Sequence, residues 1–357
     1  MKWTVRRLAR CQSAMVAALA IAMGAIASGA IVPDRAGAQS VTPELVEAAK
    51  KEKQVNFYCS ADLPVCEKVS RDFEAKYPGI TVKVERSGSE RLFQRIGQEV
   101  QTRINNCDVV NTSDGSHFLI WKREDMLAKW VPEDVEKFFP AEAKDQDGFY
   151  ATWRASLATF AVNTSLVKPE EMPKSWADLL KPEWKNRIVK AHPGYSGHAV
   201  TTNLALVRML GWEYLEKLAA QGVMHVQSAA DPPRKVAVGE RAVGIDGTEL
   251  ALAEVAKGAP IVIVYPEEGT PRVSSPAAVL ARAPHPNAAR LFASYMFSPE
   301  AQRTTVKLGW VRSFHPEAPS SAGVKPMSEI KIHPDDPADI DKSVEELKRR
   351  YTRIFGT

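Results

Sequence analysis

The sequence predicts an α/β fold made of two units, each a mainly parallel sheet flanked by helices. In the first part of the chain, short apolar runs alternate with amphipathic helical periodicity in the order strand, helix, strand, helix, strand, which is typical of a parallel sheet. The same alternation returns after about residue 150. The length of 357 residues also suits two hydrophobic cores better than one.

Residues 1–38 are predicted to be a secretory signal peptide. Basic residues precede an apolar run from Ala14 to Ile31, and Ala36-Gly37-Ala38 has the small residues of a cleavage site. A retained membrane anchor is the alternative, but glycines interrupt the apolar run, and a span needs roughly 20 apolar residues. Residues 1–38 hold five basic residues and one acidic residue, so their removal takes the formal charge from +4 to zero. The remaining 319 residues therefore lack the basic excess expected of a nucleic-acid-binding protein.

The first unit is predicted from alternating patterns and helix caps. Thr42-Pro43-Glu44 has the cap, the proline and the acid of a helix start. Val65, Val69 and Phe73 recur every four residues, as on one face of a helix. In chain order we expect a helix to Lys53, a strand at 54–58, a helix ending at Pro78-Gly79, a strand at 80–84, a helix at 92–100 and a strand at 108–111.

The second unit repeats this alternation, and the chain then closes with helices. We expect strands at 156–162, 187–190, 242–246 and 261–265, and helices at 176–180, 196–210, 212–220, 250–256, 286–297, 299–308 and 341–354. The predicted domains are therefore 39–150 for the first part of lobe 1, 151–264 for lobe 2, 265–312 for the return to lobe 1, and 313–357 for a tail with a terminal helix.

Cys59 and Cys66 are predicted to form a disulfide. They would tie the end of a strand to the first turns of the next helix, in an exported protein whose compartment permits disulfides. Cys107 stands at the entry to a buried strand, so we expect a small buried thiol there. The three cysteines lack the paired spacing of a zinc site.

Small polar residues follow several predicted strands, at the edge of a parallel sheet where ligands usually bind. Each could instead be a plain helix cap. Arg154 precedes the strand that enters the second unit, where it could grip an anion or form a hinge salt bridge. Tyr195 and Tyr265 lie on loops at the ends of predicted strands and could contact a ligand or pack. The predicted ligand-binding residues are Ser60, Ser87, Ser89, Ser113, Asp114, Arg154, Tyr195, Ser196, Asp246 and Tyr265.

The patterns of several enzyme classes are missing from the sequence. Ser87-Gly88-Ser89 is too short for a phosphate loop, and Gly194-Tyr195-Ser196-Gly197-His198 does not match the GxSxG of a hydrolase. The histidines show no HExxH pairing. We therefore expect neither catalysis nor a cofactor or resident metal.

Six segments carry a family resemblance over nearly all of the chain after residue 38. They are Val55–Cys59 with Phe73–Ile80, Asp108-Val109-Val110, Trp176–Leu180, and the more specific pair Pro284–Phe292 and Ser298–Gln302. With these segments the chain resembles the extracellular solute-binding proteins that include the ferric-ion-binding proteins. The resemblance implies a two-lobed periplasmic-binding fold of type II with hinge strands between the lobes.

The resemblance also implies a function. A monomeric periplasmic protein would capture a small polar or anionic organic solute between its lobes and deliver it to the membrane permease of an ABC importer. Ferric-binding members place adjacent tyrosines where this chain has Asp246-Gly247-Thr248-Glu249, which removes the main anionic ligands for ferric iron. Ferric transport and ligand sensing without transport are therefore the alternatives.

Overall fold

The computed structural model describes residues 39–357, so the predicted signal peptide lies outside the described residues. The strands are β1 (Gln54–Cys59), β2 (Thr81–Arg86), β3 (Val109–Asn111), β4 (Ala151–Asn163), β5 (Ile188–Ala191), β6 (Met224–Val226), β7 (Val243–Gly247), β8 (Ile261–Val264), β9 (Thr270–Val279) and β10 (Ile332–His333). The α-helices are α1 (Pro43–Glu52), α2 (Leu63–Lys76), α3 (Ser89–Thr102), α4 (Gly115–Arg123), α5 (Glu133–Phe138), α6 (Gly197–Leu210), α7 (Trp212–Ala219), α8 (Asp231–Ala237), α9 (Thr248–Val255), α10 (Pro286–Phe297), α11 (Pro299–Gly309) and α12 (Pro337–Phe355). Within this part of the chain, no helix has the length and apolar character needed to cross a membrane.

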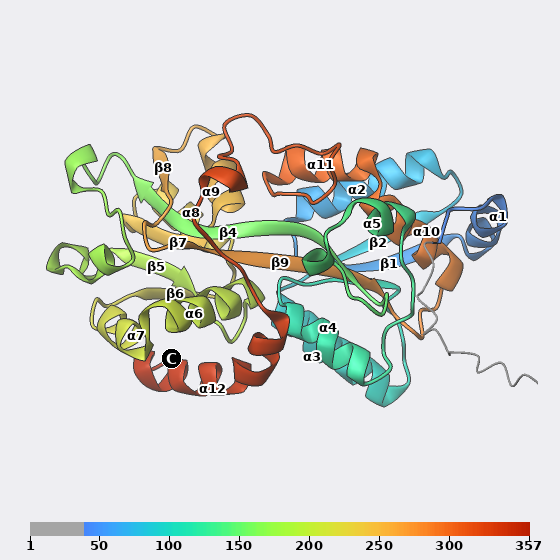
Figure 1. Cartoon of the computed structure of the whole chain (residues 1–357), viewed down its shortest axis with the longest axis horizontal. Coiled ribbons are helices and arrows are strands. Elements are labelled where there is room, and N and C mark those ends of the chain that lie inside the picture. Colours follow the sequence, from blue (N-terminus) through green and yellow to red (C-terminus); the bar gives the residue numbers. More distant parts are fainter. Residues whose placement is uncertain (1–38) are drawn as a thin grey trace, which may run out of the picture. The chain divides into compact units, whose positions relative to one another are not determined.

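The strands form one continuous path in the order β2-β1-β3-β9-β4-β7-β5-β6, and the sheet is mixed (Figure 1). At one end β1 is parallel to β2 and β3, and at the other β5 is parallel to β6 and β7. Between these two parallel groups, β9 is antiparallel to β3 and to β4, and β4 is antiparallel to β7. The prediction of mainly parallel sheets thus holds for the two groups, while the long strands that join them run antiparallel.

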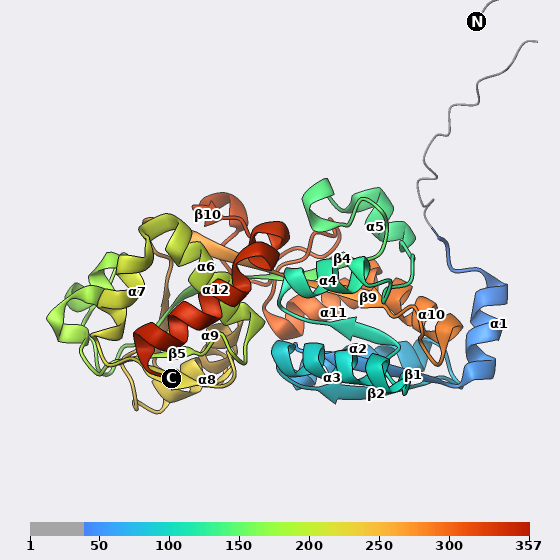
Figure 2. The ribbon, with the colours of Figure 1, turned by 90° about the horizontal axis from the view of Figure 1, so that it is seen from below.

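Each parallel group has its own hydrophobic core. Around β1–β3 the largest buried cluster includes Phe57, Phe73 and Trp153, with α2, α10 and α11 on one face of the sheet and α3 and α4 on the other (Figures 1 and 2). Around β5–β7 the main cluster includes Phe160 and Trp176. This second cluster is completed by four residues of α12, Ile340, Val344, Leu347 and Tyr351.

Several predicted elements are confirmed. The Thr42 hydroxyl accepts the Leu45 N–H at 3.2 Å, as a helix cap should. Cys59 and Cys66 form the expected disulfide between β1 and α2, and Cys107 is a buried free cysteine. The expected helix at 176–180 is instead a short 3₁₀ segment, Ala177–Leu180.

The strand β9 was not predicted. Its sequence contains Pro271 and Pro276 and several serines, and prolines lower the strand propensity of a segment because they cannot donate a ladder hydrogen bond. Opposite Pro276 the β4–β9 register shifts between Thr152 and Arg154, leaving Trp153 as the extra residue. Such an irregularity re-aims the neighbouring side chain, and here that neighbour is Arg154.

Candidate functional site

A polar pocket lies where loops and helix N-termini from both parallel groups meet. It is reached by the first turns of α2, α3, α6 and α9, and by the loop between β6 and α8. Free backbone N–H groups and the helix dipole make such N-termini favourable for anions. The pocket is lined by Ser60, Ala61, Asp62, Val65, Arg86, Gly88, Ser89, Ser113, Arg154, Tyr195, Ser196, His198, Gln227, Ser228, Ala229, Ala230, Glu249, Leu250, Ala253, Leu308, Gly309 and Val311.

Six of the ten predicted ligand-binding residues line this pocket. They are Ser60, Ser89, Ser113, Arg154, Tyr195 and Ser196. They come from four strand–helix junctions and from β4. Residues far apart in sequence thus meet at the carboxyl ends of parallel strands, where ligand sites usually lie.

Two close backbone approaches hold these loops against one another. A Cβ atom added to Gly88 would lie 2.9 Å from the carbonyl oxygen of Tyr195, and one added to Gly197 would lie 2.8 Å from the Asp114 Cβ atom. Real Cβ atoms do not come this close to such atoms, so both positions require glycine. The loop before α3 therefore packs on the loop before α6, and the start of α6 packs on the loop before α4.

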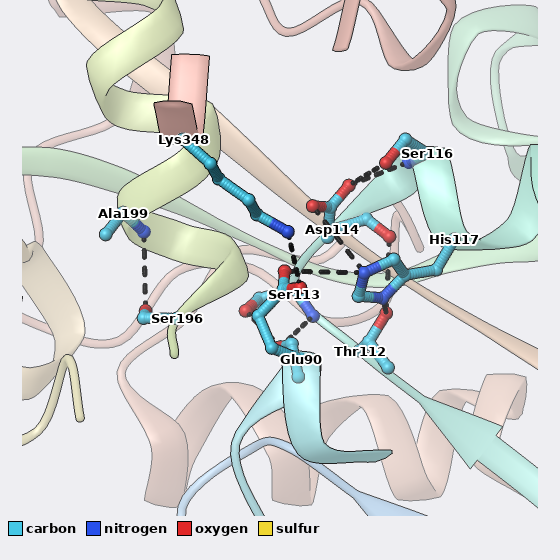
Figure 3. A network of polar contacts seen from close by, with 10 residues as sticks. Glu90, Thr112, Ser113, Asp114, Ser116, His117, Ser196, Ala199 and Lys348 are labelled. Atoms are coloured by element: carbon cyan, nitrogen blue, oxygen red, sulfur yellow. Dashed lines mark hydrogen bonds and ion pairs between the residues drawn. The ribbon is translucent and has the colours of Figure 1, made fainter. Parts of the chain in front are cut away.

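The serines of the pocket differ in what they already bind. The Ser89 and Ser113 hydroxyls lie 2.9 Å apart, and the Ser113 N–H donates to the Ser89 hydroxyl at 3.1 Å. Ser196 is the cap of α6, because its hydroxyl accepts the Ala199 N–H at 3.3 Å (Figure 3). Ser60 Oγ is buried and has no hydrogen-bond partner within the described residues, so a hydrogen bond with a solute would satisfy it.

Arg154 supplies buried positive charge to the pocket. Its side chain is 7% exposed, and its Nε has no hydrogen-bond partner within residues 39–357. Burial lowers the pKa of the guanidinium, and the Glu249 carboxylate opposes that shift; the group remains charged at neutral pH because an arginine pKa lies far above 7. An arginine with a free N–H in a polar pocket is suited to bind a carboxylate or phosphate.

Glu249 and His198 complete the inner wall, and neither was predicted. Burial raises the pKa of the Glu249 carboxyl, while Arg154 opposes the rise. Burial, helped by the charge of Arg154, lowers the pKa of His198 to about 4, so its imidazole is neutral at pH 7. Glu249 Oε2 and His198 Nε2 both lack hydrogen-bond partners among the described residues.

Four predicted ligand-binding residues do not line the pocket. The Ser87 N–H donates to the Cys59 carbonyl, and Asp114 caps α4 by accepting the Ser116 N–H at 2.9 Å. Asp246 is buried on β7, with Oδ2 only 3.0 Å from where a Cβ atom of Gly244 would lie. Tyr265 follows β8, where the Lys325 ammonium lies 5.6 Å from its ring centroid.

Further lining residues were not predicted from the sequence, namely Asp62, Arg86 and the 227–230 segment. Asp62 immediately precedes α2 and was available as a helix-cap signal, whereas Arg86 is the last residue of β2 and had no distinguishing pattern. The 227–230 loop follows β6, a strand of three residues, Met224–Val226, which is too short to be read from periodicity.

Comparisons with known proteins place the chain in a family. Residues 111–329 match the family model described as bacterial extracellular solute-binding protein, and the chain belongs to that family. It is thus a solute-binding protein and not an enzyme.

Two curated relatives are similar over most of their length. A Sinorhizobium fredii protein named "Probable ABC transporter periplasmic-binding protein" is 24% identical over 297 residues, covering 79% of this chain and 80% of the relative. A Salmonella typhimurium protein named "Putative 2-aminoethylphosphonate-binding periplasmic protein" is 24% identical over 253 residues, covering 68% of this chain and 72% of the relative.

Solved structures show the same fold. The periplasmic binding protein AfuA from Actinobacillus pleuropneumoniae, with fructose-6-phosphate bound, has a TM-score of 0.79 at 24% identity, covering 85% of this chain and 98% of AfuA. Iron-bound HitA from Pseudomonas aeruginosa has a TM-score of 0.73 at 22% identity, covering 84% of this chain and 99% of HitA. The fold is therefore that of the α/β periplasmic binding proteins.

Proposed function

We propose that the chain is the periplasmic solute-binding component of an ABC importer and that its solute is a small organic phosphate or phosphonate. The observation that carries the proposal is the convergence of four helix N-termini and the buried Arg154 on one pocket whose Ser60 and His198 atoms lack partners. Relatives named for 2-aminoethylphosphonate and for an ABC transporter, and a similar structure with fructose-6-phosphate bound, support the same class.

In this proposal, export through a cleaved signal peptide brings the protein to the periplasm. The two hydrophobic cores are two lobes, and β4 and β9 are the strands that join them. A solute that touches both walls of the pocket stabilises the closed arrangement by binding it more tightly than the open one. The closed protein then delivers the solute to a membrane permease.

Ferric iron is the alternative, since HitA is an iron-bound member of the same fold. The lining residues give it few ligands. Tyr195 is the only tyrosine among them, and both lining carboxylates, Glu249 and Asp62, interact with the positive Arg154. Hard ferric iron favours several anionic oxygen ligands, so the pocket suits an anion better than a bare metal cation.

The test is a thermal-shift screen of protein freed of bound solute, followed by calorimetry on each solute that raises the melting temperature. The panel holds 2-aminoethylphosphonate, fructose 6-phosphate, inorganic phosphate, ferric citrate, and the neutral sugar fructose as the matched control for its phosphate. We expect a shift with a phosphorylated or phosphonate solute and none with fructose. A shift with ferric citrate and with no phosphorus compound would overturn the proposal.

Substitution of the pocket residues gives the second half of the test. Arg154→Met should weaken binding of the solute at least tenfold, because a hydrogen bond to a charged group contributes about 1.5–3 kcal/mol. Ser60→Ala should weaken binding less, because it removes one neutral hydrogen bond. This variant also provides a test if Arg154→Met does not fold. Ser165→Ala, at an exposed serine that follows β4 and does not line the pocket, is the control that should bind as wild type does.

A further inference from the structure

A second polar cluster lies beside the pocket and is not used by it. Glu90 is in the first turn of α3, Asp114 caps α4, and His117 is in the first turn of α4. Their side chains are almost fully buried, with exposed fractions of 4%, 0% and 3%. Figure 3 shows the two carboxylates and the imidazole turned toward one another, with Lys348 reaching in from α12.

Each carboxylate in this cluster has one satisfied oxygen and one orphaned oxygen. Asp114 Oδ1 accepts the Ser116 N–H and hydroxyl at 2.9 and 2.6 Å, and Glu90 Oε2 accepts from Lys348 Nζ at 2.7 Å. Glu90 Oε1 and Asp114 Oδ2 have no hydrogen-bond partner among the described residues. These two orphaned oxygens are the ones that face His117 Nε2, at 3.5 and 3.8 Å.

The other ring nitrogen of His117 is held by the chain. Its Nδ1 lies 3.2 Å from the Thr112 hydroxyl oxygen, and that hydroxyl also lies 3.2 Å from the Asp114 carbonyl oxygen, to which it can only donate. Nδ1 is therefore the donor toward Thr112, which leaves a lone pair on Nε2 of the neutral ring. An orienting hydrogen bond of this kind to the far nitrogen is the usual arrangement of a metal-ligating histidine.

Two carboxylate oxygens and a nitrogen lone pair that face one another in a buried site attract a cation between them. A proton on Nε2 is one candidate, but 3.5 and 3.8 Å are too long for good N–H···O hydrogen bonds. A divalent ion is the other. Ligand atoms at about 2.0–2.2 Å from a tetrahedral zinc ion lie about 3.4 Å from one another. The three ligand atoms of this cluster all lie within 4.8 Å of one another, so a small inward shift would bring them to that spacing.

We propose that Glu90, Asp114 and His117 form a binding site for a divalent cation of the zinc class. One imidazole nitrogen and two carboxylate oxygens are ligands that zinc and cobalt(II) accept, and the two negative charges balance a divalent ion. The stacked Phe93 ring, 4.4 Å from the His117 ring, fixes the imidazole and excludes water from one side. This inference is independent of the solute of the neighbouring pocket.

A substitution of Lys348 distinguishes a cation site from a simple salt-bridge cluster. Its ammonium pairs with Glu90, and its side chain is 27% exposed, so it can move into solvent. A positive charge at this distance opposes a bound metal ion. Lys348→Met should therefore tighten metal binding if the site exists, whereas in a salt-bridge cluster the same change would only remove an ion pair.

The test is a titration of chelator-treated protein with cobalt(II), followed by visible absorption, and with zinc, followed by calorimetry, in the absence of any solute. We expect one equivalent bound with the absorption of a nitrogen–oxygen site. His117→Ala and Asp114→Asn should abolish it, and Lys348→Met should bind about tenfold more tightly. His333→Ala, a histidine on β10 outside the cluster, is the control and should bind as wild type does.

Two results would contradict the proposed cation site. If neither wild type nor the Lys348→Met variant binds cobalt(II), a proton and not a metal ion bridges the cluster. If binding occurs but is the same in His117→Ala, the metal lies elsewhere. Asp114→Asn alters a helix cap and could fail to fold. Lys348 lies at the edge of the cluster, so the Lys348→Met variant keeps the test valid in that case. Circular dichroism shows whether each variant is folded.

Discussion

Lys190 lies in the middle of β5, where a sequence pattern would place an apolar residue. It is 2% exposed, and within residues 39–357 no carboxylate offsets the burial of its ammonium. Its ammonium donates to the Asn203 side-chain oxygen and lies 5.1 Å from the Tyr351 ring centroid. Burial without a counter-ion disfavours the charged form and lowers the pKa of Lys190 to about 7.

The lowered pKa of Lys190 predicts a rise of stability with pH. Between about 7, the folded value, and the ordinary value near 10.5, the unfolded chain binds more protons than the folded chain, so the free energy of unfolding increases as pH rises. From pH 7 to pH 9 we expect wild type to gain about 2 kcal/mol relative to the Lys190→Met variant. Urea unfolding at both pH values should show that Lys190→Met removes this gain.

The matched control is Lys217→Met, since Lys217 is 60% exposed on α7. That variant should keep the rise of wild type. An equal rise in the Lys190→Met variant would show that another group, and not Lys190, is responsible. The comparison ends at pH 9 because tyrosines whose pKa is raised by burial, such as Tyr214, oppose stability at higher pH.

At the residue scale, the sequence predicted the part of the pocket that follows from chain geometry. Ser60, Ser89 and Ser196 were found because small polar residues between a strand and a helix lie at the ligand-binding edge of a parallel sheet. Arg86 and Glu249 could not be found in this way. Their place in the pocket depends on how β2 and α9 from different parallel groups approach each other, which no local pattern encodes.

The disulfide between β1 and α2 is the clearest link between neighbouring elements. Cys59 ends β1, and Cys66 lies in the second turn of α2, seven residues later. Ser60, Ala61 and Asp62 of the closed loop all line the pocket. The disulfide thus limits the motion of a segment that the proposed solute contacts.

Removal of the disulfide should lower stability by about 2 kcal/mol, because a short closed loop restricts the unfolded chain by about that amount. The variant is Cys59→Ala with Cys66→Ala, compared with wild type by urea unfolding under non-reducing conditions. Adding a reductant should lower the stability of wild type toward that of the variant and leave the variant unchanged. A reductant-insensitive wild type would show that the bond does not contribute.

The matched control for this comparison is Cys107→Ala. Cys107 is a buried free cysteine, and burial raises the pKa of its thiol, so it is not a reactive thiolate at neutral pH. The Cys107→Ala protein should retain the full effect of the reductant, which separates the disulfide from general thiol chemistry.

Element by element, the strands and helices with strong periodicity were predicted, and those held by tertiary contacts were not. The helices α2 and α3 and the strands of the first group follow their patterns. In contrast, β9 carries two prolines and is a strand only because β3 and β4 flank it. The final helix was expected at 341–354 but begins at Pro337, since Asp336 caps it by accepting the Ala338 N–H.

Across the whole molecule, α12 connects the two parallel groups. Its apolar face completes the core around β5–β7, while Arg123 of α4 pairs with Asp341 and Lys348 pairs with Glu90 of α3. Toward the first group α12 also makes a close approach, since a Cβ atom added to Gly115 of α4 would lie 2.9 Å from the Pro337 ring. The core residues of α12 thus belong to the second group, while Pro337 and the two ion pairs hold the helix against the first group.

A further polar contact joins the two groups at the rim of the pocket. Arg91, an exposed residue of α3, donates to the Gln227 side-chain oxygen at 2.6 Å, and its guanidinium lies 5.9 Å from the Tyr195 ring centroid. Gln227 and Tyr195 both line the pocket, opposite α3. In the proposed closing motion, these contacts hold the two rims of the closed arrangement together.

Arg91→Ala should therefore release the solute faster without weakening the unliganded protein. We expect the dissociation rate of the tightest-binding phosphorus compound of the panel to rise about tenfold, since a hydrogen bond from a charged group contributes about 1.5 kcal/mol or more, while the association rate changes little. Stopped-flow tryptophan fluorescence measures both rates, and Arg303→Ala, an exposed arginine of α11 paired with Glu317, is the control. An unchanged dissociation rate with wild-type melting temperature would mean that the rim contact does not hold the closed state, and that closure depends on the solute's contacts with Arg154 and Ser60 alone.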